Sequence, residues 1–466
     1  MSPPRRRSVL AAGLALLVAG CAGAPPFAPP AVPVPPRWLG QDGAAALSAT
    51  WWESFGDPVL SALVAEALRS NPDLRQAAAR VAEARAMARA QHAAQAPTLD
   101  FGGGATRSRS VSDVTLEPYR STGWQGQFQA AYELDLWGRL DALDAAAGRS
   151  AEAAQAARDA MALSMAATVA SAYVGLRSLD AQLEVARRTL EARAQSLAVT
   201  RRRERQGWAS ALESAQAEAE WRAAAGAVPR LELAVDQQQR QLNVLLGRLP
   251  GTVERGTPLL ALQVPGLPAA GLPSQLLRRR PDIAGAEWQL AAADAQFEAA
   301  RAQLLPSVRL GASVGRIGAT VLRDDPFTVW SLGGSVLAPL FNGGRLRALR
   351  DAADARRAQA LAGYERTVLG AFAEVENQLA AVDRQGRQLL EAEAQQAALE
   401  RALALAERRY REGYVSYLDE LVAQRSLYGA QQAVVQLHAE RLQATIALYR
   451  ALGGGWRHDA DAGAGG

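Results

Sequence analysis

The sequence predicts a mainly α-helical chain that also contributes strands to a membrane β-barrel and contains two internal repeats. Matching landmarks recur in the same order, and the two that open the repeats, Pro72 and Pro281, are 209 residues apart. Two proline-free stretches, 139–206 and 345–412, would each span about 100 Å as a helix. Before each stretch, a short region alternates apolar and polar residues, which is the period of a β-strand.

The N-terminus has the layout of a secretory signal, 1–20, followed by a lipid attachment site. Three arginines at 5–7 precede an apolar run at 9–20 that is too short to span a membrane. The next residue, Cys21, is the only cysteine and completes a Leu-x-Ala-Gly-Cys pattern that resembles the bacterial lipobox. The alternative is an incidental thiol, but a lone thiol in an exported chain cannot form an internal disulfide, which favours acylation of Cys21.

The segment after the signal predicts a tether for an outer-membrane lipoprotein. Residue 22 is alanine, not the aspartate that, in proteins with a lipobox, favours retention at the inner membrane. Proline and alanine then dominate 22–37, and such a stretch is extended and has no core. We therefore interpret 21–50 as a lipid-anchored, proline-rich tether.

Composition excludes several classes of function. Without the three arginines of the signal, the 51 basic residues fall to 48 against 47 acidic ones. No basic stripe interleaved with aromatic residues is present, so nucleic acid is not an expected partner. Beyond the signal we find no apolar run long enough for a transmembrane helix, so a membrane crossing would need a closed β-barrel.

Each half is expected to contain a first helix, a β-hairpin and a long helical hairpin. In the first half these are 51–96, 97–137 and 138–250, followed by a linker at 251–273. The second half repeats them at 274–305, 306–341 and 342–453, before a flexible tail at 454–466.

The strand regions have one apolar and one polar face. Along 124–136, Trp124, Phe128 and Tyr132 share the apolar face, and three glutamines and Glu133 lie on the other, with Ala131 as the exception. A weaker first strand starts at Leu99, and in the second half Val308 begins one strand while 327–341 returns. This alternation is typical of strands between lipid and a wet lumen. The alternative is two amphipathic hairpins of a soluble sheet, which would need cover on the apolar face.

Four strands are fewer than the roughly eight of a closed barrel, so the chain is expected to oligomerise.

The long helices are expected to pack as coiled coils. One heptad series has leucines at 176, 183, 190 and 197, and another consists of Val375, Val382 and Leu389, with Leu403 two heptads later. Gly207 and Gly413 are expected to end these helices because glycine tolerates positive φ. In the returning helix of the first half, Gly226 and Pro229 predict a break.

No enzyme chemistry is expected. The three histidines, His92, His438 and His458, have no carboxylate or cysteine companions at metal-ligand spacing. The glycines at 102–104 lie in a strand and no Lys-Ser/Thr follows, and no Gly-x-Ser-x-Gly elbow or Cys/His pair occurs. We expect no metal and no cofactor other than a covalent lipid on Cys21.

Several motifs in order resemble the TolC-like outer-membrane efflux proteins, in particular the lipoprotein branch that serves resistance-nodulation-division pumps. The motifs are Trp-Trp-Glu-Ser-Phe-Gly-Asp-Pro at 51–58, Asn-Pro-Asp-Leu at 71–74, Leu-Trp-Gly-Arg at 136–139, Arg-Arg-Arg-Pro-Asp-Ile at 278–283 and Phe-Asn-Gly-Gly-Arg at 341–345. The resemblance implies a homotrimer with a twelve-stranded barrel, a twelve-helix periplasmic tunnel and an equatorial belt. It also implies passive conduction of drugs and toxic small molecules received from an inner-membrane pump and a periplasmic adaptor.

The resemblance places the functional residues at the two helix turns. It implies adaptor contact at the turn of Gly207, Trp208, Ala209 and Ser210 and at the turn of Gly413, Tyr414, Val415 and Ser416. Simple turn chemistry is the alternative explanation of these residues.

A periplasmic gate is implied just after the second turn. The family's Leu-Asp-Ala-Gln is Leu-Val-Ala-Gln here at 421–424, so Val422 replaces the acidic residue. We therefore expect a hydrophobic gate at Leu418 and Val422 that closes by dewetting, with charge from Asp419 or Glu420.

Two other functions are compatible with a long exported chain. A structural lipoprotein could span the periplasm as a coiled coil without a pore, although the Gln/Glu face of 124–136 argues against it. A surface-anchored hydrolase would need a nucleophile and a base, and we find no such pair.

Overall fold

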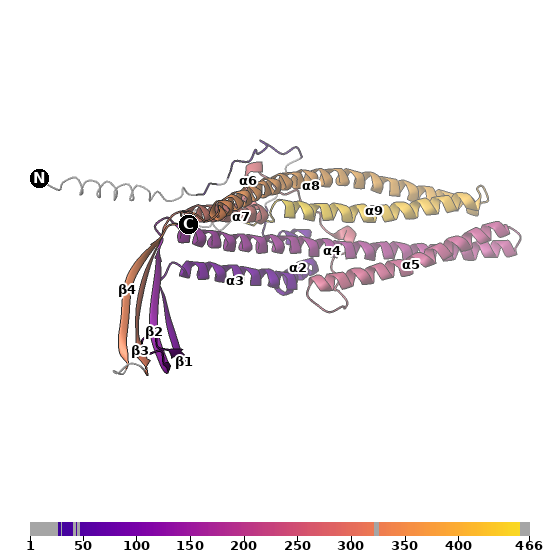
Figure 1. The fold of residues 1–466 in the computed structure, drawn as a ribbon. Helices are drawn as coiled ribbons and strands as arrows, with labels where there is room; N and C mark the ends of the chain where they lie inside the picture. Colours follow the sequence, from indigo (N-terminus) through magenta and orange to yellow (C-terminus); the bar gives the residue numbers. More distant parts are fainter. Residues whose placement is uncertain (1–26, 29, 41–42, 44–46, 321–325, 457–466) are drawn as a thin grey trace. The chain divides into compact units, whose positions relative to one another are not determined.

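A computed structural model describes residues 27–28, 30–40, 43, 47–320 and 326–456. The predicted signal, the lipidation residue Cys21 and His458 lie outside the described residues. The chain divides into two compact units. Unit 1 comprises Met1–Ala31, Arg80–Gln155 and Gly285–Glu365, and unit 2 comprises Val32–Ala79, Ala156–Ala284 and Arg366–Gly466. Figure 1 labels the helices and strands along the chain.

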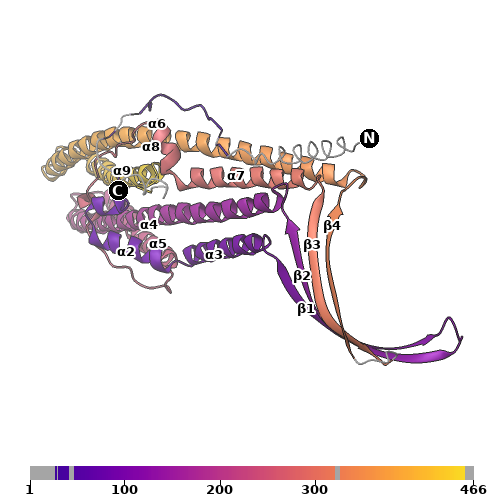
Figure 2. The same ribbon diagram turned by 90° about the vertical axis from the view of Figure 1, so that its left-hand side faces the viewer.

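Unit 1 contains one four-stranded sheet whose strands follow each other in chain order (Figure 2). The strands are β1 (Thr98–Val111), β2 (Pro118–Leu134), β3 (Ser307–Ala319) and β4 (Phe327–Leu337). Each neighbouring pair is antiparallel, so β1 and β4 form two edges. The predicted alternation is preserved across the sheet, because Phe101 lies opposite Phe128 and Gln129 lies opposite Ser313.

β4 is shorter than the strand expected at 327–341. It ends at Leu337, two residues before Pro339. Proline lacks the N–H that a strand needs for its ladder, which explains the early end.

Side chains close to the sheet fix where the long helices of unit 1 begin. Helix α4 (Arg139–Arg205) follows β2, and α8 (Arg345–Arg411) follows β4. The Trp137 indole Nε1 donates to the carbonyl of Pro306 at 2.7 Å, which ties the end of β2 to the start of β3. Gly138 adopts φ of 69°, which allows the chain to turn from strand to helix.

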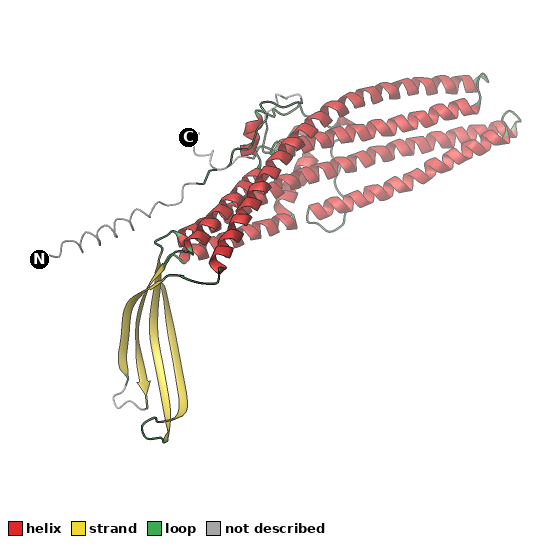
Figure 3. Ribbon diagram, turned by 45° about the horizontal axis from the view of Figure 1, so that its top comes forward, coloured by secondary structure: helices red, strands yellow, loops and turns green. Residues whose placement is uncertain are grey.

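Unit 2 contains most of two helical hairpins (Figure 3), and each helix of the first hairpin has the same length as its counterpart in the second. Helices α4 and α8 have 67 residues each, and α5 (Ala211–Leu245) and α9 (Tyr417–Ala451) have 35 each. Most of the predicted heptad residues are buried: Leu176, Leu183, Leu197, Val375, Val382 and Leu389. Leu190 and Leu403 are half-buried.

The first helix expected in each repeat is divided into two helices by a proline. In the first repeat α2 (Pro58–Ser70) is followed by α3 (Pro72–Ala93), and in the second α6 (Pro273–Arg279) is followed by α7 (Pro281–Ala302). The residues before these prolines, Asn71 and Arg280, are extended, with ψ of 130° and 121°. Proline disfavours the helical conformation of its predecessor, which explains the division.

The predicted break at Gly226 and Pro229 is wrong. α5 continues through both residues from Ala211 to Leu245. Pro229 is exposed, so a carbonyl released by its ring can bind water. Ala217 before it and Leu231 after it are buried, and this packing holds both sides of the helix in line.

The predicted flexible tail is also wrong for its first residues. Gly454 and Gly455 have positive φ, and Gly454 is buried. A side chain at Gly455 would meet the backbone of Ser48 and Ala49 at 2.6 Å, so only glycine fits this approach. The residues from 457 onward lie outside the described part of the chain.

The 51–58 motif forms a buried corner of unit 2. Trp51, in the short helix η1 (Trp51–Phe55), stacks on Tyr449 with ring centroids 5.4 Å apart. The Asp57 carboxylate accepts hydrogen bonds from the N–H of Val59 at the start of α2 and from the Tyr173 hydroxyl, both at 2.8 Å. Trp51 of this motif therefore belongs to the hydrophobic core, and Asp57 caps the N-terminus of α2.

The linker at 251–273 contains a second short helix, η2 (Leu259–Ala261).

Helix α4 contains one 18-residue window that is apolar enough to cross a membrane by length and composition. This window differs from the expectation that no sufficiently long apolar run follows the signal. Nearly half of it is buried, and α4 contributes Val169, Tyr173 and Leu176 to the core of unit 2, which accounts for the apolar character of this helix.

Candidate functional site

The sheet of unit 1 has the polar face that the sequence predicts. Ser313 and Ser331 lie opposite each other and their hydroxyl groups are 2.8 Å apart. Towards the helical end, the Glu133 carboxylate pairs with the Arg139 guanidinium at 2.6 Å and with the Arg309 guanidinium at 3.3 Å. This face therefore carries hydroxyl, amide and charged groups along its length.

The opposite face exposes large apolar side chains. Phe101 and Phe128 contact each other with ring centroids 5.0 Å apart, yet they remain 64% and 50% exposed. In β4, Trp330 and Leu332 are 76% and 77% exposed. An uncovered apolar face of this size marks a surface that meets lipid or another apolar partner.

The two helix turns in unit 2 have the same backbone geometry. After α4, the N–H of Gly207 donates to the Glu204 carbonyl and that of Trp208 to the Arg203 carbonyl, both at 2.9 Å. After α8, Gly413 and Tyr414 make the same pair of bonds to the carbonyls of Tyr410 and Arg409. With φ of 75° at Gly207 and 82° at Gly413, both turns are glycine-ended helix caps.

A serine then starts each returning helix. The Ser210 hydroxyl accepts the N–H of Glu213 at 3.3 Å. In the second turn, the Asp419 carboxylate accepts the N–H and the hydroxyl of Ser416, at 3.0 and 2.7 Å. Glycine and serine in both motifs are thus explained by turn and cap chemistry.

The aromatic residue of each turn has no such structural role. Trp208 is 77% exposed and Tyr414 is 78% exposed. Val415 instead packs against a cluster of buried side chains that joins all four helices: Leu197, Ala217, Tyr410, Tyr417 and Leu421. The structure thus separates exposed turn residues from those that hold the hairpins together.

The three predicted gate residues lie in the first two turns of α9. Leu418 and Val422 are each 53% exposed and, four residues apart, share one helix face. Asp419 is exposed beside them, although its carboxylate is bonded to Ser416.

The expectation that Glu420 could contribute charge at the gate is wrong. Glu420 is only 7% exposed, because it lies on the opposite side of α9 from Leu418. Burial raises the pKa of its carboxyl group and Glu407 raises it further, while Arg203, Arg411 and a hydrogen bond from Gln424 oppose the increase. The period of the helix could have predicted this orientation, since Tyr417, Glu420 and Leu421 share one face.

An ionic cluster that the sequence analysis missed joins three helices. The Glu220 carboxylate in α5 pairs with Arg193 in α4 and with Arg425 in α9, whose Nε lies 2.7 Å away. Arg193 is 7% exposed on its side chain and Glu220 13%. No local pattern signals such a cluster, because its members are 27 and 205 residues apart.

No metal site is evident among the described residues, where no group of three or more His, Cys, Asp or Glu side chains converges. His92 has a carboxylate partner that its sequence neighbourhood does not reveal, since its Nδ1 lies 3.0 Å from Asp144. His438 is half-buried, and burial together with Arg441 lowers its pKa.

Comparison with known proteins places the whole arrangement in one family. The family model described as outer membrane efflux protein matches residues 63–248 and 272–454, one stretch in each repeat. The chain is 37% identical to the pyoverdine export outer membrane protein OpmQ of Pseudomonas putida, over 98% of this chain and 99% of that protein. It is 35% identical to the toluene efflux pump outer membrane protein TtgF from another strain of Pseudomonas putida, over 96% of both.

A solved structure agrees with these relatives. The outer-membrane channel OprN superposes with a TM-score of 0.84 at 30% identity, covering 92% of this chain and 99% of that one. The sequence motifs, the family model that matches both repeats, and the shared fold lead to the same conclusion. The chain belongs to the outer membrane efflux protein family.

Proposed function

We propose that three copies of this chain form a passive conduit through the outer membrane for small toxic molecules delivered by an inner-membrane pump and a periplasmic adaptor. The observation that carries this proposal is the two-faced sheet with long edges at β1 and β4. Four strands cannot close a barrel, whereas twelve from three chains can. Pairing of β4 with β1 of the next copy would satisfy the backbone hydrogen bonds of both edge strands. The polar face of the sheet would then line the lumen, and the apolar face would contact lipid.

The named cargoes of the relatives support an amphipathic or apolar substrate. The relatives are described by export of pyoverdine and of toluene. The wet face of β2 and β3, with Gln129 and Ser313, suits passage of such molecules without strong binding.

In this proposal the exposed turn residues Trp208 and Tyr414 contact the adaptor, and Leu418 and Val422 form the gate. Their exposure supports both roles, because neither pair contributes to the buried cluster. A hydrophobic ring of Leu418 and Val422 from three chains would close by excluding water.

Electron microscopy of the detergent-solubilised mature protein tests the conduit directly. We expect end-on averages with a three-fold ring and an open centre, and side views with a cylinder longer than about 100 Å, the length of α4. A solid rod would contradict the conduit and favour the structural lipoprotein that spans the periplasm without a pore.

The lipid anchor on Cys21 is tested by Cys21→Ala. We expect loss of acylation, measured as the mass of the mature N-terminus, with the trimer retained in the outer membrane because the barrel itself anchors it. A soluble periplasmic monomer would contradict the barrel.

A further inference from the structure

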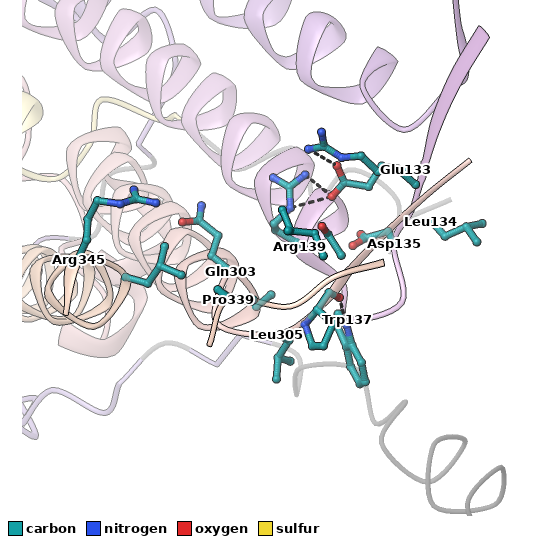
Figure 4. A pocket seen from close by; sticks show the side chains of 15 residues that line it. Glu133, Leu134, Asp135, Trp137, Arg139, Gln303, Leu305, Pro339 and Arg345 are labelled. Carbon is teal, nitrogen blue, oxygen red and sulfur yellow. Dashed lines mark hydrogen bonds and ion pairs between the residues drawn. The ribbon is translucent and has the colours of Figure 1, made fainter. Parts of the chain in front are cut away.

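Unit 1 contains a cavity of about 310 Å³ where the polar face of the sheet meets the starts of α4 and α8 (Figure 4). Glu133 and Arg139 line one side, and the side chains of Arg345 and Gln303 point towards each other on the far side. Trp137, Leu305, Pro306, Leu337 and Pro339 supply apolar surface. The cavity is at the small end of the range for ligand sites.

The charges in this cavity do not cancel. Glu133 is shared by two guanidinium groups, those of Arg139 and Arg309. The Asp135 carboxylate accepts the backbone N–H of Asp141 at 2.8 Å and so caps the start of α4. The third guanidinium, that of Arg345, is exposed, and no described carboxylate lies within ion-pair distance of it. Three arginines therefore face two carboxylates.

The internal repeat explains the surplus cation. Arg139 and Arg345 are equivalent, since each starts a 67-residue helix after a positive-φ glycine. Six residues before Arg139 stands Glu133, its ion-pair partner, whereas six residues before Arg345 stands Pro339. The second repeat thus has the arginine without a matching carboxylate, and both arginines face one cavity.

We propose that this cavity is a subsite for amphipathic carboxylates in transit, in which Arg345 binds the carboxylate and the Trp137–Pro306 wall holds the apolar part. The proposal rests on the proposed function, because the polar face must line the lumen for a substrate to reach it. A carboxylate supplies the charge that Pro339 does not, and a charge-assisted hydrogen bond to a guanidinium is stronger than one between neutral groups.

The test compares 4-phenylbutyrate with 4-phenylbutanamide, which have the same apolar part and differ in charge. Both are titrated against the intact trimer, by current block in planar bilayers and by calorimetry in detergent. We expect the carboxylate to bind at least about tenfold more tightly than the amide. Arg345→Gln should abolish this preference, and Pro339→Glu should do so too by supplying a carboxylate at the position that matches Glu133.

Arg347→Gln is the matched control, because Arg347 is an exposed arginine of α8 that does not line the cavity. It should keep the preference. Equal binding of carboxylate and amide to the unmodified trimer, or a preference that survives Arg345→Gln, would overturn the proposal. Absence of any current would instead count against the conduit, while the calorimetric titration would still decide the subsite.

Discussion

The helical hairpin of the first repeat, α4 and α5, and that of the second, α8 and α9, have helices of identical lengths and turns with identical hydrogen bonds. Their side chains differ at matched positions 206 residues apart. Ser214 corresponds to Glu420, and Glu220 corresponds to Ser426. The duplication thus preserved the glycine and serine residues that set the backbone, while the charges diverged. The asymmetry of the two hairpins therefore lies in a few side chains that can be exchanged singly.

The largest effect is expected at the residue before the proline that starts α3 or α7. This residue is Asn71 in the first repeat and Arg280 in the second, and the two make different contacts. Arg280 is 8% exposed and binds Asp282, Glu374 and the Ala451 carbonyl, at 2.7, 2.7 and 2.9 Å. Arg280→Ala leaves Asp282 without its cation and Glu374 with Arg450 alone, and we expect a loss of about 3–5 kcal/mol in the free energy of unfolding.

The matching substitution, Asn71→Ala, should cost less. The Asn71 amide donates to the Leu245 carbonyl and its oxygen caps the start of α3 at the N–H of Asp73, both at 2.8 Å. Loss of these neutral bonds should cost about 1–3 kcal/mol. Thermal unfolding of the trimer in detergent compares the two, with the exposed Arg278→Ala as control. Equal shifts in Tm would contradict the ionic explanation.

The next effect is expected at the ionic cluster that only one repeat possesses. Glu220→Gln weakens the links of α5 to Arg193 and Arg425, and we expect a local loss of about 1–3 kcal/mol because Arg193 stays buried. Amide hydrogen exchange of residues 417–428 should accelerate. Ser426→Ala, at the matching exposed position of the second repeat, should leave exchange unchanged. Unchanged exchange in Glu220→Gln would show that the cluster does not hold α9.

The sequence predicted some features of the fold and not others. Periodic features were predictable: the strand alternation that places Phe101 opposite Phe128, and the heptads that bury Leu176 and Val375. Family membership and the channel function followed from motifs that the comparisons confirm. Each feature depends on residues close together in the chain, or on motifs long enough to be specific.

Features set by tertiary packing were not predictable from local pattern. Pro229 should break a helix, yet buried neighbours on both sides keep α5 continuous. Gly454 and Gly455 were expected in a flexible tail, yet a side chain at Gly455 would meet the backbone of Ser48 and Ala49 at 2.6 Å. The ion pairs of Glu220 and the cavity lined by Glu133 and Arg345 both join distant segments of the chain. Residue spacing alone could not have paired these segments.

A smaller, pH-dependent effect separates Glu420 from its counterpart Ser214. Burial raises the pKa of Glu420 above its ordinary value, so the folded state holds the proton more tightly than the unfolded state. The stability of the α9 turn should therefore fall as pH rises from the ordinary glutamate range through this raised pKa. Glu420→Gln should remove that pH dependence and raise Tm at neutral pH, whereas the exposed Asp419→Asn should retain the pH dependence. A parallel Tm–pH profile in Glu420→Gln and the parent protein would refute this role.

The smallest effect on stability, and the clearest separation of folding from function, is expected at the exposed turn residues. Trp208→Ala and Tyr414→Ala remove side chains that are 77% and 78% exposed and make no buried contacts, so the free energy of unfolding should change by no more than about 0.5 kcal/mol. Aromatic side chains frequently dominate binding at interfaces, so affinity for a purified cognate adaptor should fall at least about fivefold for each. The same affinity measurement on Leu212→Ala, an apolar residue that is 67% exposed and lies one helical turn from Trp208, sharpens the comparison. If all three substitutions reduced affinity alike, the whole end of the hairpin would bind the adaptor, and if none did, turn chemistry alone would account for both motifs.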